Sequence, residues 1–301
     1  MVRSFSVVLL LSLTVWQGSP RRATSWAAGP AKAPVTTRDA GAGQLMGAAL
    51  YGESGEGAYA VARSLTDEVG PRLAGSPGDA RAVAWALAAM RAAGLANVRA
   101  EPVKVPRWLR GAIEEGDVVD ATGRATQRLG LMALGGSGPT GPGGAPLVAE
   151  VIEVKSLAEL AALPPERVRG RIVLFNTEMH RGADGMANYG EVAPVRALGP
   201  LSAAKLGAVG ALVRSLGVVN YRLPHTGAIR TADDVPRIPA AAVAGEDADL
   251  LHRLLQRGPV RVRLRLDCSQ AGDADSANVI GEAPGAGSQA SEIVLVGAHL
   301  D

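Results

Sequence analysis

The sequence has few cysteines, few aromatic residues and no large excess of positive or negative charge. Cys268 is the only cysteine among 301 residues, which excludes an intrachain disulfide and a zinc site built from several thiolates. We therefore expect Cys268 to be a packed, inert thiol. Aromatic residues make up 3% of the chain, so alanine, valine and leucine must fill the core. Lysine and arginine total 31 against 29 acidic residues, and without a basic stripe no nucleic-acid partner is expected.

The chain also lacks a long hydrophobic run. Arg3 precedes the apolar run Phe5–Trp16, and the small residues Ser25 and Ala27 follow it, a pattern typical of an export signal. The run is about 12 residues long, shorter than the roughly 20 that cross a bilayer. We predict a signal peptide over residues 1–28, no stable membrane span after its removal, and a secreted or periplasmic protein. A retained anchor is the alternative.

No Gly-x-Ser-x-Gly sequence occurs, and no base neighbours Cys268, so covalent nucleophilic catalysis is not predicted. The hydrophobic fraction of 47% is enough for a full core. The 38 glycines and 19 prolines indicate many turns. Together these features favour an α/β or mixed architecture.

Helical signals follow a linker predicted over residues 29–50. Apolar spacing predicts a helix over 51–69, and a second helix begins after Ser76, the predicted N-cap. Pro77 suits the first position of that helix, and Asp79 completes a capping pattern. Gly94 is placed to end it, and an extended stretch follows.

The middle of the chain combines turns with short apolar runs. A phosphate cradle is not predicted at the glycine-rich run 135–146, because strand-like residues rather than a helix follow it. Further strands are expected at 148–154, 171–175, 209–213 and 260–266, and helical stretches at 201–206 and 251–255. They form a compact mixed module over residues 125–268 that we interpret as an insertion.

Two apolar runs close the sequence, Asn278–Glu282 and Ile293–Val296, and we expect them to be neighbouring strands. Four aliphatic residues without alternation suit a strand covered on both faces, as in the centre of an α/β sheet. His299 follows directly, at the carboxyl end of that strand, where ligands collect in open α/β sheets. Asp301 can accept a hydrogen bond from one imidazole nitrogen and leave the other for a metal. A short His-x-Asp pair also occurs in ordinary surface turns.

The other histidines are weaker candidates. His180 lies among arginine and glycine in a predicted loop, His225 follows a proline, and His252 falls in a short leucine-rich helix. Each is expected to be structural or solvated.

Several stretches, taken in order, resemble one family: the carboxypeptidase Q (plasma glutamate carboxypeptidase) group of co-catalytic zinc exopeptidases. The resemblance extends from about residue 50 to Asp301. The stretches that carry it are Leu65-Thr66-Asp67, Gly70-Pro71-Arg72-Leu73, Gly75-Ser76-Pro77-Gly78, Val105-Pro106-Arg107-Trp108, Leu134-Gly135-Gly136-Ser137, Gly170-Arg171-Ile172-Val173-Leu174-Phe175-Asn176, Gly207-Ala208-Val209-Gly210-Ala211, Pro224-His225-Thr226-Gly227, Asn278-Val279-Ile280-Gly281-Glu282 and Gly297-Ala298-His299-Leu300-Asp301.

The resemblance implies a three-layer α/β/α zinc-exopeptidase domain, incomplete here, with an inserted β-rich mixed protease-associated domain. Its parts would be residues 51–124, the inserted domain at 125–268 and the start of the metal-binding core at 269–301. The inserted domain would lie over the active site and restrict access to it.

By the same resemblance, His299 ligates one of two Zn²⁺ ions and Asp301 orients it. The family's other zinc ligands and its glutamate base come after Asp301. The implied substrates are small peptides such as dipeptides, and a homodimer is possible. This chain by itself is expected to be inactive. A non-catalytic binding module and a pseudogene product of the same architecture are the alternatives.

Overall fold

A computed structural model describes residues 41–44, 46–48, 57–183, 185–218, 221–285, 287 and 290–301. The chain divides into two units, Met1–Ala62 and Arg63–Asp301, which are treated separately. The predicted signal at 1–28 and the first residues of the predicted helix at 51–69 lie outside the described residues. No helix within the described ranges is both long and apolar enough to span a bilayer.

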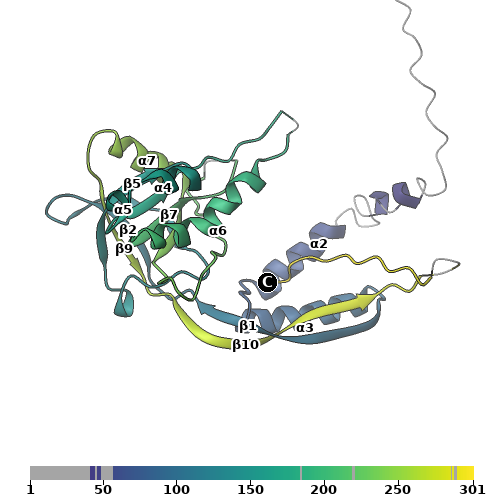
Figure 1. Ribbon diagram of the computed structural model, residues 1–301. Helices are drawn as coiled ribbons and strands as arrows, with labels where there is room; N and C mark the ends of the chain where they lie inside the picture. The colour runs from purple at the N-terminus through teal and green to yellow at the C-terminus, as the bar shows by residue number, and fades with distance from the viewer. Residues whose placement is uncertain are drawn as a thin grey trace, which may run out of the picture. The chain divides into compact units, whose positions relative to one another are not determined.

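The described chain contains both helices and strands, with the helices distributed among the strands (Figure 1). The helical elements are α2 (Gly57–Ser64), the π-helix η1 (Leu65–Val69), α3 (Pro77–Ala92), the 3-10 turn η2 (Pro142–Gly144), α4 (Leu157–Ala162), α5 (Pro165–Val168), α6 (Tyr189–Lys205) and α7 (Gly245–Leu255). The strands are β1 (Ala96–Leu109), β2 (Glu114–Val119), β3 (Ala125–Leu129), β4 (Leu131–Ala133), β5 (Leu147–Val154), β6 (Ile172–Phe175), β7 (Gly210–Arg214), β8 (Ala240–Val243), β9 (Arg261–Leu266) and β10 (Ser269–Glu282).

Helix α3 has the ends that the sequence predicts. The Ser76 hydroxyl accepts a hydrogen bond from the Asp79 amide at 3.2 Å, and Pro77 occupies the first helical position. The Asp79 carboxylate in turn accepts from the Gly75 amide at 2.8 Å, so both capping groups satisfy amides at the helix start. Gly94 follows the last turn with φ of 77°, a left-handed conformation that glycine adopts without strain.

Strands β1 and β10 form a two-stranded antiparallel ribbon whose pairing runs from Ala96↔Glu282 to Leu109↔Ser269. Helix α3 packs against both strands. The predicted extended stretch after α3 and the predicted strand Asn278–Glu282 are thus confirmed. Their pairing was not predicted, because the two strands are far apart in sequence.

The other eight strands form one mixed sheet in the order β3-β2-β9-β5-β6-β7-β8-β4. Strands β5 to β8 run parallel, and the remaining pairs are antiparallel. The two outermost strands, β3 and β4, are separated along the chain only by Gly130. The sheet must therefore curl until its ends approach, and a side chain at Gly116 in β2 would collide with Leu131 in β4.

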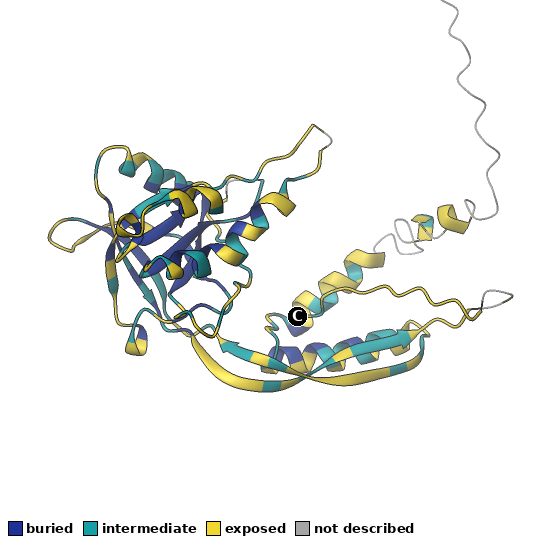
Figure 2. Cartoon of the chain, in the orientation of Figure 1, coloured by how far each residue is buried: buried dark blue, intermediate teal, exposed yellow. Residues whose placement is uncertain are grey.

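The core lies on both faces of the parallel strands. Every residue of Ile172–Phe175 is fully buried, and its side chains alternate between two apolar clusters. Helices α4, α5 and α6 cover one cluster, whereas α7 and strands β2, β4 and β9 enclose the other. These central strands are dark blue in Figure 2. Burial on both faces explains why the strand reads as continuous apolar sequence.

The predicted mixed module corresponds to this sheet with some differences in extent. The sheet takes in β2, which begins at Glu114, before the predicted boundary at Ala125. The predicted helical stretch 201–206 is the end of the longer α6, which contains two prolines. Within α6, Gly199 lies against the Phe175 ring, which a Cβ would approach to 2.9 Å. The identification of the module as a protease-associated domain stays a prediction.

The ribbon joins the sheet through polar contacts near Leu109. The Trp108 indole donates to the carbonyl oxygen of Ser137 at 3.0 Å. Arg110 donates to the carbonyl oxygen of Ala133 at 2.8 Å and pairs with Glu114 at 2.9 Å. These contacts fix the point where the chain passes from β1 into the sheet.

The expectation for Ile293–Val296 was wrong for this chain. These residues form no strand, and their exposed fractions are 91%, 87%, 92% and 88%. Strand β10 pairs with β1 instead of with this run. Four aliphatic side chains favour a strand, but a strand forms only where a neighbour supplies backbone partners and a covering layer.

Candidate metal centre

The structure brings together the two residues that the sequence singles out. The Nδ1 atom of His299 lies 3.0 Å from Oδ1 of Asp301, within hydrogen-bonding distance. This contact uses Nδ1 and leaves Nε2 as the nitrogen that can bind a metal. The side chains are exposed to 91% for His299 and 46% for Asp301, so solvent and ions can reach both.

His299 offers one protein ligand, whereas a catalytic zinc normally takes three. Within the ranges that the structure describes, no three His, Cys, Asp or Glu residues are grouped to hold a metal ion. The residues present therefore supply one of the ligands of a zinc site. Imidazole nitrogen with a carboxylate behind it suits zinc, which binds histidine nitrogen well.

A third residue contacts this segment and was missed from the sequence. Nε of Arg72 donates to the carbonyl oxygen of Leu300, between His299 and Asp301, at 2.6 Å. Nη1 of Arg72 donates to the carbonyl oxygen of Gly70 at 3.1 Å. The only signal in the sequence was the run 70–73, which was assigned to the N-terminal helical region without a role.

The predicted structural role of His252 agrees with its surroundings. Its Nδ1 lies 2.7 Å from the Glu153 carboxylate, which also accepts from the Asn176 amide at 2.5 Å. Arg214 donates to Asn176 at 3.1 Å and pairs with Asp249 at 2.5 Å. Glu153, Asn176 and Arg214 lie at the carboxyl ends of β5, β6 and β7, a common place for ligands. Here these groups bind one another, and the network holds α7 against the sheet.

His180 and His225 take no part in a cluster of ligands. Each donates its backbone amide to a neighbouring side chain, His180 to Asn188 at 2.9 Å and His225 to Ser215 at 2.9 Å. Both belong to loops that follow parallel strands. The contacts fix loop conformation.

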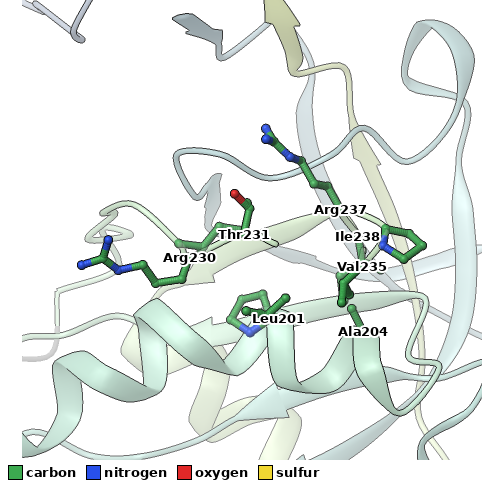
Figure 3. Close-up of a pocket in the computed structure, with 10 residues that line it drawn as sticks. Leu201, Ala204, Arg230, Thr231, Val235, Arg237 and Ile238 are labelled. Carbon is green, nitrogen blue, oxygen red and sulfur yellow. The ribbon is translucent and has the colours of Figure 1, made fainter. Parts of the chain in front are cut away.

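Two hollows lie on the mixed module. One, of about 490 Å³, is lined by β5, by Glu159 and Arg167 and by the chain after α7. The other, beside α6, has a volume of about 10 Å³, room for a single water molecule. In Figure 3 the guanidinium groups of Arg230 and Arg237 point away from Leu201. Neither hollow contains His299 or Asp301.

Cys268 is buried, in agreement with its predicted role as a packed thiol. Its sulfur lies 3.3 Å from the Ser137 hydroxyl and 3.2 Å from the carbonyl oxygen of Gly138. Burial raises the pKa of the Cys268 thiol above its ordinary value of 9.0. A buried, protonated thiol is a poor nucleophile and a poor metal ligand.

Comparison with known proteins first indicates a class. No protein-family model matches the chain. The crystal structure of a peptidase M28 precursor from Shewanella amazonensis superposes with a TM-score of 0.77 at 39% sequence identity, covering 87% of this chain and 57% of that one. The fold is therefore similar to that of an M28 peptidase.

The particular relatives are carboxypeptidase Q proteins. The chain is 33% identical to carboxypeptidase Q of Homo sapiens and 34% identical to that of Bos taurus over 258 residues. The matches cover 85% of this chain and 52% of each relative, so the chain spans about half the length of the curated relatives it matches. The chain is thus similar to carboxypeptidase Q over most of its length, which confirms the resemblance drawn from its motifs; the protease-associated domain within that resemblance stays a prediction.

Proposed function

We propose that this chain carries part of the metal site of a zinc-dependent exopeptidase that hydrolyses dipeptides or other short peptides, of the carboxypeptidase or dipeptidase type. The observation that carries the proposal is the contact between His299 and Asp301 in a carboxypeptidase Q-like chain. A zinc-binding imidazole commonly has a carboxylate as the hydrogen-bond partner of its other ring nitrogen, and Asp301 occupies that place for His299.

His299 binds zinc through Nε2. The Asp301 carboxylate accepts a hydrogen bond from Nδ1–H of His299, which fixes the tautomer and makes Nε2 a better ligand for the metal. When bound, zinc polarises the scissile carbonyl and lowers the pKa of a bound water. By the family resemblance, two Zn²⁺ ions would share the site, and further ligands and a glutamate base would complete it.

The rest of the sequence fits an exported peptidase. Residues 1–28 direct export, and the protein is secreted or periplasmic. The module that we assign to a protease-associated domain, residues 125–268, restricts access to the metal site. Removal of that domain should then change the relative rates on short and long peptides.

The balanced charge offers no surface for nucleic acid.

The test uses the protein expressed from its whole reading frame. His299→Ala should remove one zinc ion per chain and reduce dipeptide hydrolysis at least a hundredfold, whereas the loop variant His180→Ala should match the parent in both. Asp301→Asn should weaken zinc binding about 10–100-fold, because its amide holds the imidazole less firmly. Zinc is counted by atomic absorption after dialysis against a chelator series.

A parent protein that binds no zinc would overturn the proposal. So would a His299→Ala variant with undiminished zinc content and activity. Either result would favour the alternative, a binding module of the same architecture without catalysis.

A further inference from the structure

The loop between η1 and α3 reaches the metal-binding segment through one side chain. Nε of Arg72 donates to the carbonyl oxygen of Leu300 at 2.6 Å, and the two residues are 228 positions apart in sequence. Both ends of the contact are partly buried, which shields the hydrogen bond from water. A hydrogen bond from a charged donor is stronger than a neutral one, and it shortens accordingly.

Arg72 itself is held by the loop that carries it. Its Nη1 donates to the carbonyl oxygen of Gly70, which fixes the guanidinium relative to its own backbone. Gly70 and Gly75, which enclose the loop, have φ of 72° and 74°, conformations that are strained for other residues. The backbone around Arg72 therefore has few alternatives to the observed path.

The loop is also fixed from outside. A Cβ at Gly78 would collide with the carbonyl group of Pro71, so the start of α3 lies directly on the loop. A Cβ at Gly75 would approach Ala274 of β10 to 2.9 Å, so the loop also lies against the ribbon. The cap of α3 adds the buried carboxylate of Asp79, which binds the Gly75 amide at 2.8 Å. The loop that carries Arg72 is therefore held in place by α3 and by the ribbon.

The acceptor is the peptide group between the two residues of the site. Successive side chains of an extended chain point to opposite sides, so the orientation of residue 300 decides the side on which His299 and Asp301 meet. Rotation of the Leu300 peptide would carry its carbonyl away from Arg72 and separate the imidazole from the carboxylate. The hydrogen bond from Arg72 opposes that rotation.

We propose that Arg72 is a positioning residue of the metal site, which holds the backbone of Leu300 so that His299 and Asp301 share one side and Nε2 faces the zinc. This inference rests on the proposed function, because it needs His299 to bind metal. Arg72 contacts neither the metal nor the substrate in this role. It acts through the backbone between the ligand and the residue that orients it.

Arg81 provides a matched control. It is an arginine close to the same loop, and it donates to the carbonyl oxygens of Val69 at 3.2 Å and Pro77 at 3.3 Å. Its contacts support the loop and α3 without reaching residue 300. Arg72→Met and Arg81→Met each remove a guanidinium group and keep the apolar part of the side chain.

The experiment compares zinc affinity, measured by competition with a fluorescent chelator, in the protein expressed from its whole reading frame. Arg72→Met should lower zinc affinity about tenfold or more, in the range known for residues that orient a ligand. Arg81→Met should bind zinc like the parent. Arg72→Lys, which keeps a charged donor, should recover part of the loss. Thermal unfolding of the metal-free proteins should show no larger loss for Arg72→Met than for Arg81→Met.

Substitution of zinc by cobalt gives a second measurement, which a general change in protein stability would not alter. The visible absorption of bound Co²⁺ reports ligand geometry, and it should change in Arg72→Met and remain unchanged in Arg81→Met. Equal zinc affinity in Arg72→Met and the parent, or equal losses in both methionine variants, would overturn the inference. His299→Ala separates the two proposals. If it leaves zinc affinity intact, the proposed function fails. If it abolishes binding while Arg72→Met binds normally, only the role of Arg72 fails.

Discussion

Two four-residue apolar runs, Ile172–Phe175 and Ile293–Val296, are nearly alike in sequence and opposite in surroundings. The first is strand β6, in which each residue has an exposed fraction of 0%. The second forms no strand, and its exposed fractions are 87–92%. Figure 2 shows the contrast between the dark-blue sheet and the yellow C-terminal segment.

The difference lies in the neighbours. Strand β6 has parallel partners on both sides, β5 and β7, and apolar clusters on both faces. Burying a Val, Leu, Ile or Phe side chain contributes about 1.5–3 kcal/mol. The side chains of the run 293–296 could contribute as much if they were buried. Among the described residues, however, the run has no strand partners and no covering layer. Apolar sequence therefore specifies a strand that can be buried, and the rest of the fold decides whether it is.

The contrast between the two runs is tested most directly by shortening one leucine in each, Leu174 and Leu295. Leu174→Ala should lower the free energy of unfolding by about 2–5 kcal/mol, because it leaves a cavity in a closed core. Leu295→Ala in the same chain should change it by less than about 0.5 kcal/mol. Urea unfolding followed by circular dichroism measures both. Comparable losses in the two variants would show that the run 293–296 is packed.

A smaller effect is expected at the cap of α3. Ser76→Ala should cost about 1 kcal/mol, because the Asp79 amide loses its acceptor at the start of the helix. Ser76→Asp, which keeps an acceptor, should retain most of the stability. If both variants unfold at the parent's urea midpoint, the cap contributes nothing to the support of the Arg72 loop.

A charge placed in the exposed run should have almost no effect on stability. Leu295→Lys should leave the free energy of unfolding within about 0.5 kcal/mol and reduce self-association, because exposed apolar segments promote aggregation. Light scattering against protein concentration measures the second effect. In the protein expressed from its whole reading frame, a large loss of stability from the same substitution would show that the run becomes buried there.

A dependence of stability on pH is expected where the sheet meets the ribbon. The amide of Ile113, and then that of Ala112, lower the pKa of Asp267 below its ordinary value of 3.8. A lowered folded-state pKa contributes stability above pH 3.8 that is lost as pH falls through the folded value. Asp267→Asn should thus unfold more easily than the parent at pH 7, and the difference should shrink toward pH 2–3. Thermal melts across this range test the sign, and a difference that grows on acidification would contradict it.

Local features of the fold could be predicted from the sequence. Ser76, Asp79 and Gly94 mark the ends of α3 by chemistry that acts within a few residues. The alternation of apolar residues with arginine gave β9, and the spacing of two residues gave the contact between His299 and Asp301. Each of these depends on neighbours in the chain.

Contacts between distant residues could not be predicted in this way. Nothing in β1 or β10 alone indicates that they pair, and no periodicity links Arg72 to Leu300 or Glu153 to His252. Helix α6 was predicted too short, since glycine and proline normally end helices. Tertiary packing overrides that preference, because Gly199 provides the space for the Phe175 ring.

The pairing of Leu109 with Ser269 has a consequence for the history of the chain. The polypeptide leaves the ribbon at Leu109 and returns to it at the paired residue Ser269, so the two ends of the segment 110–268 are neighbours. A tight turn in its place would leave the two strands in register. With its ends side by side, the segment 110–268 can be exchanged or removed in one genetic event while the ribbon and the loop that carries Arg72 keep their geometry.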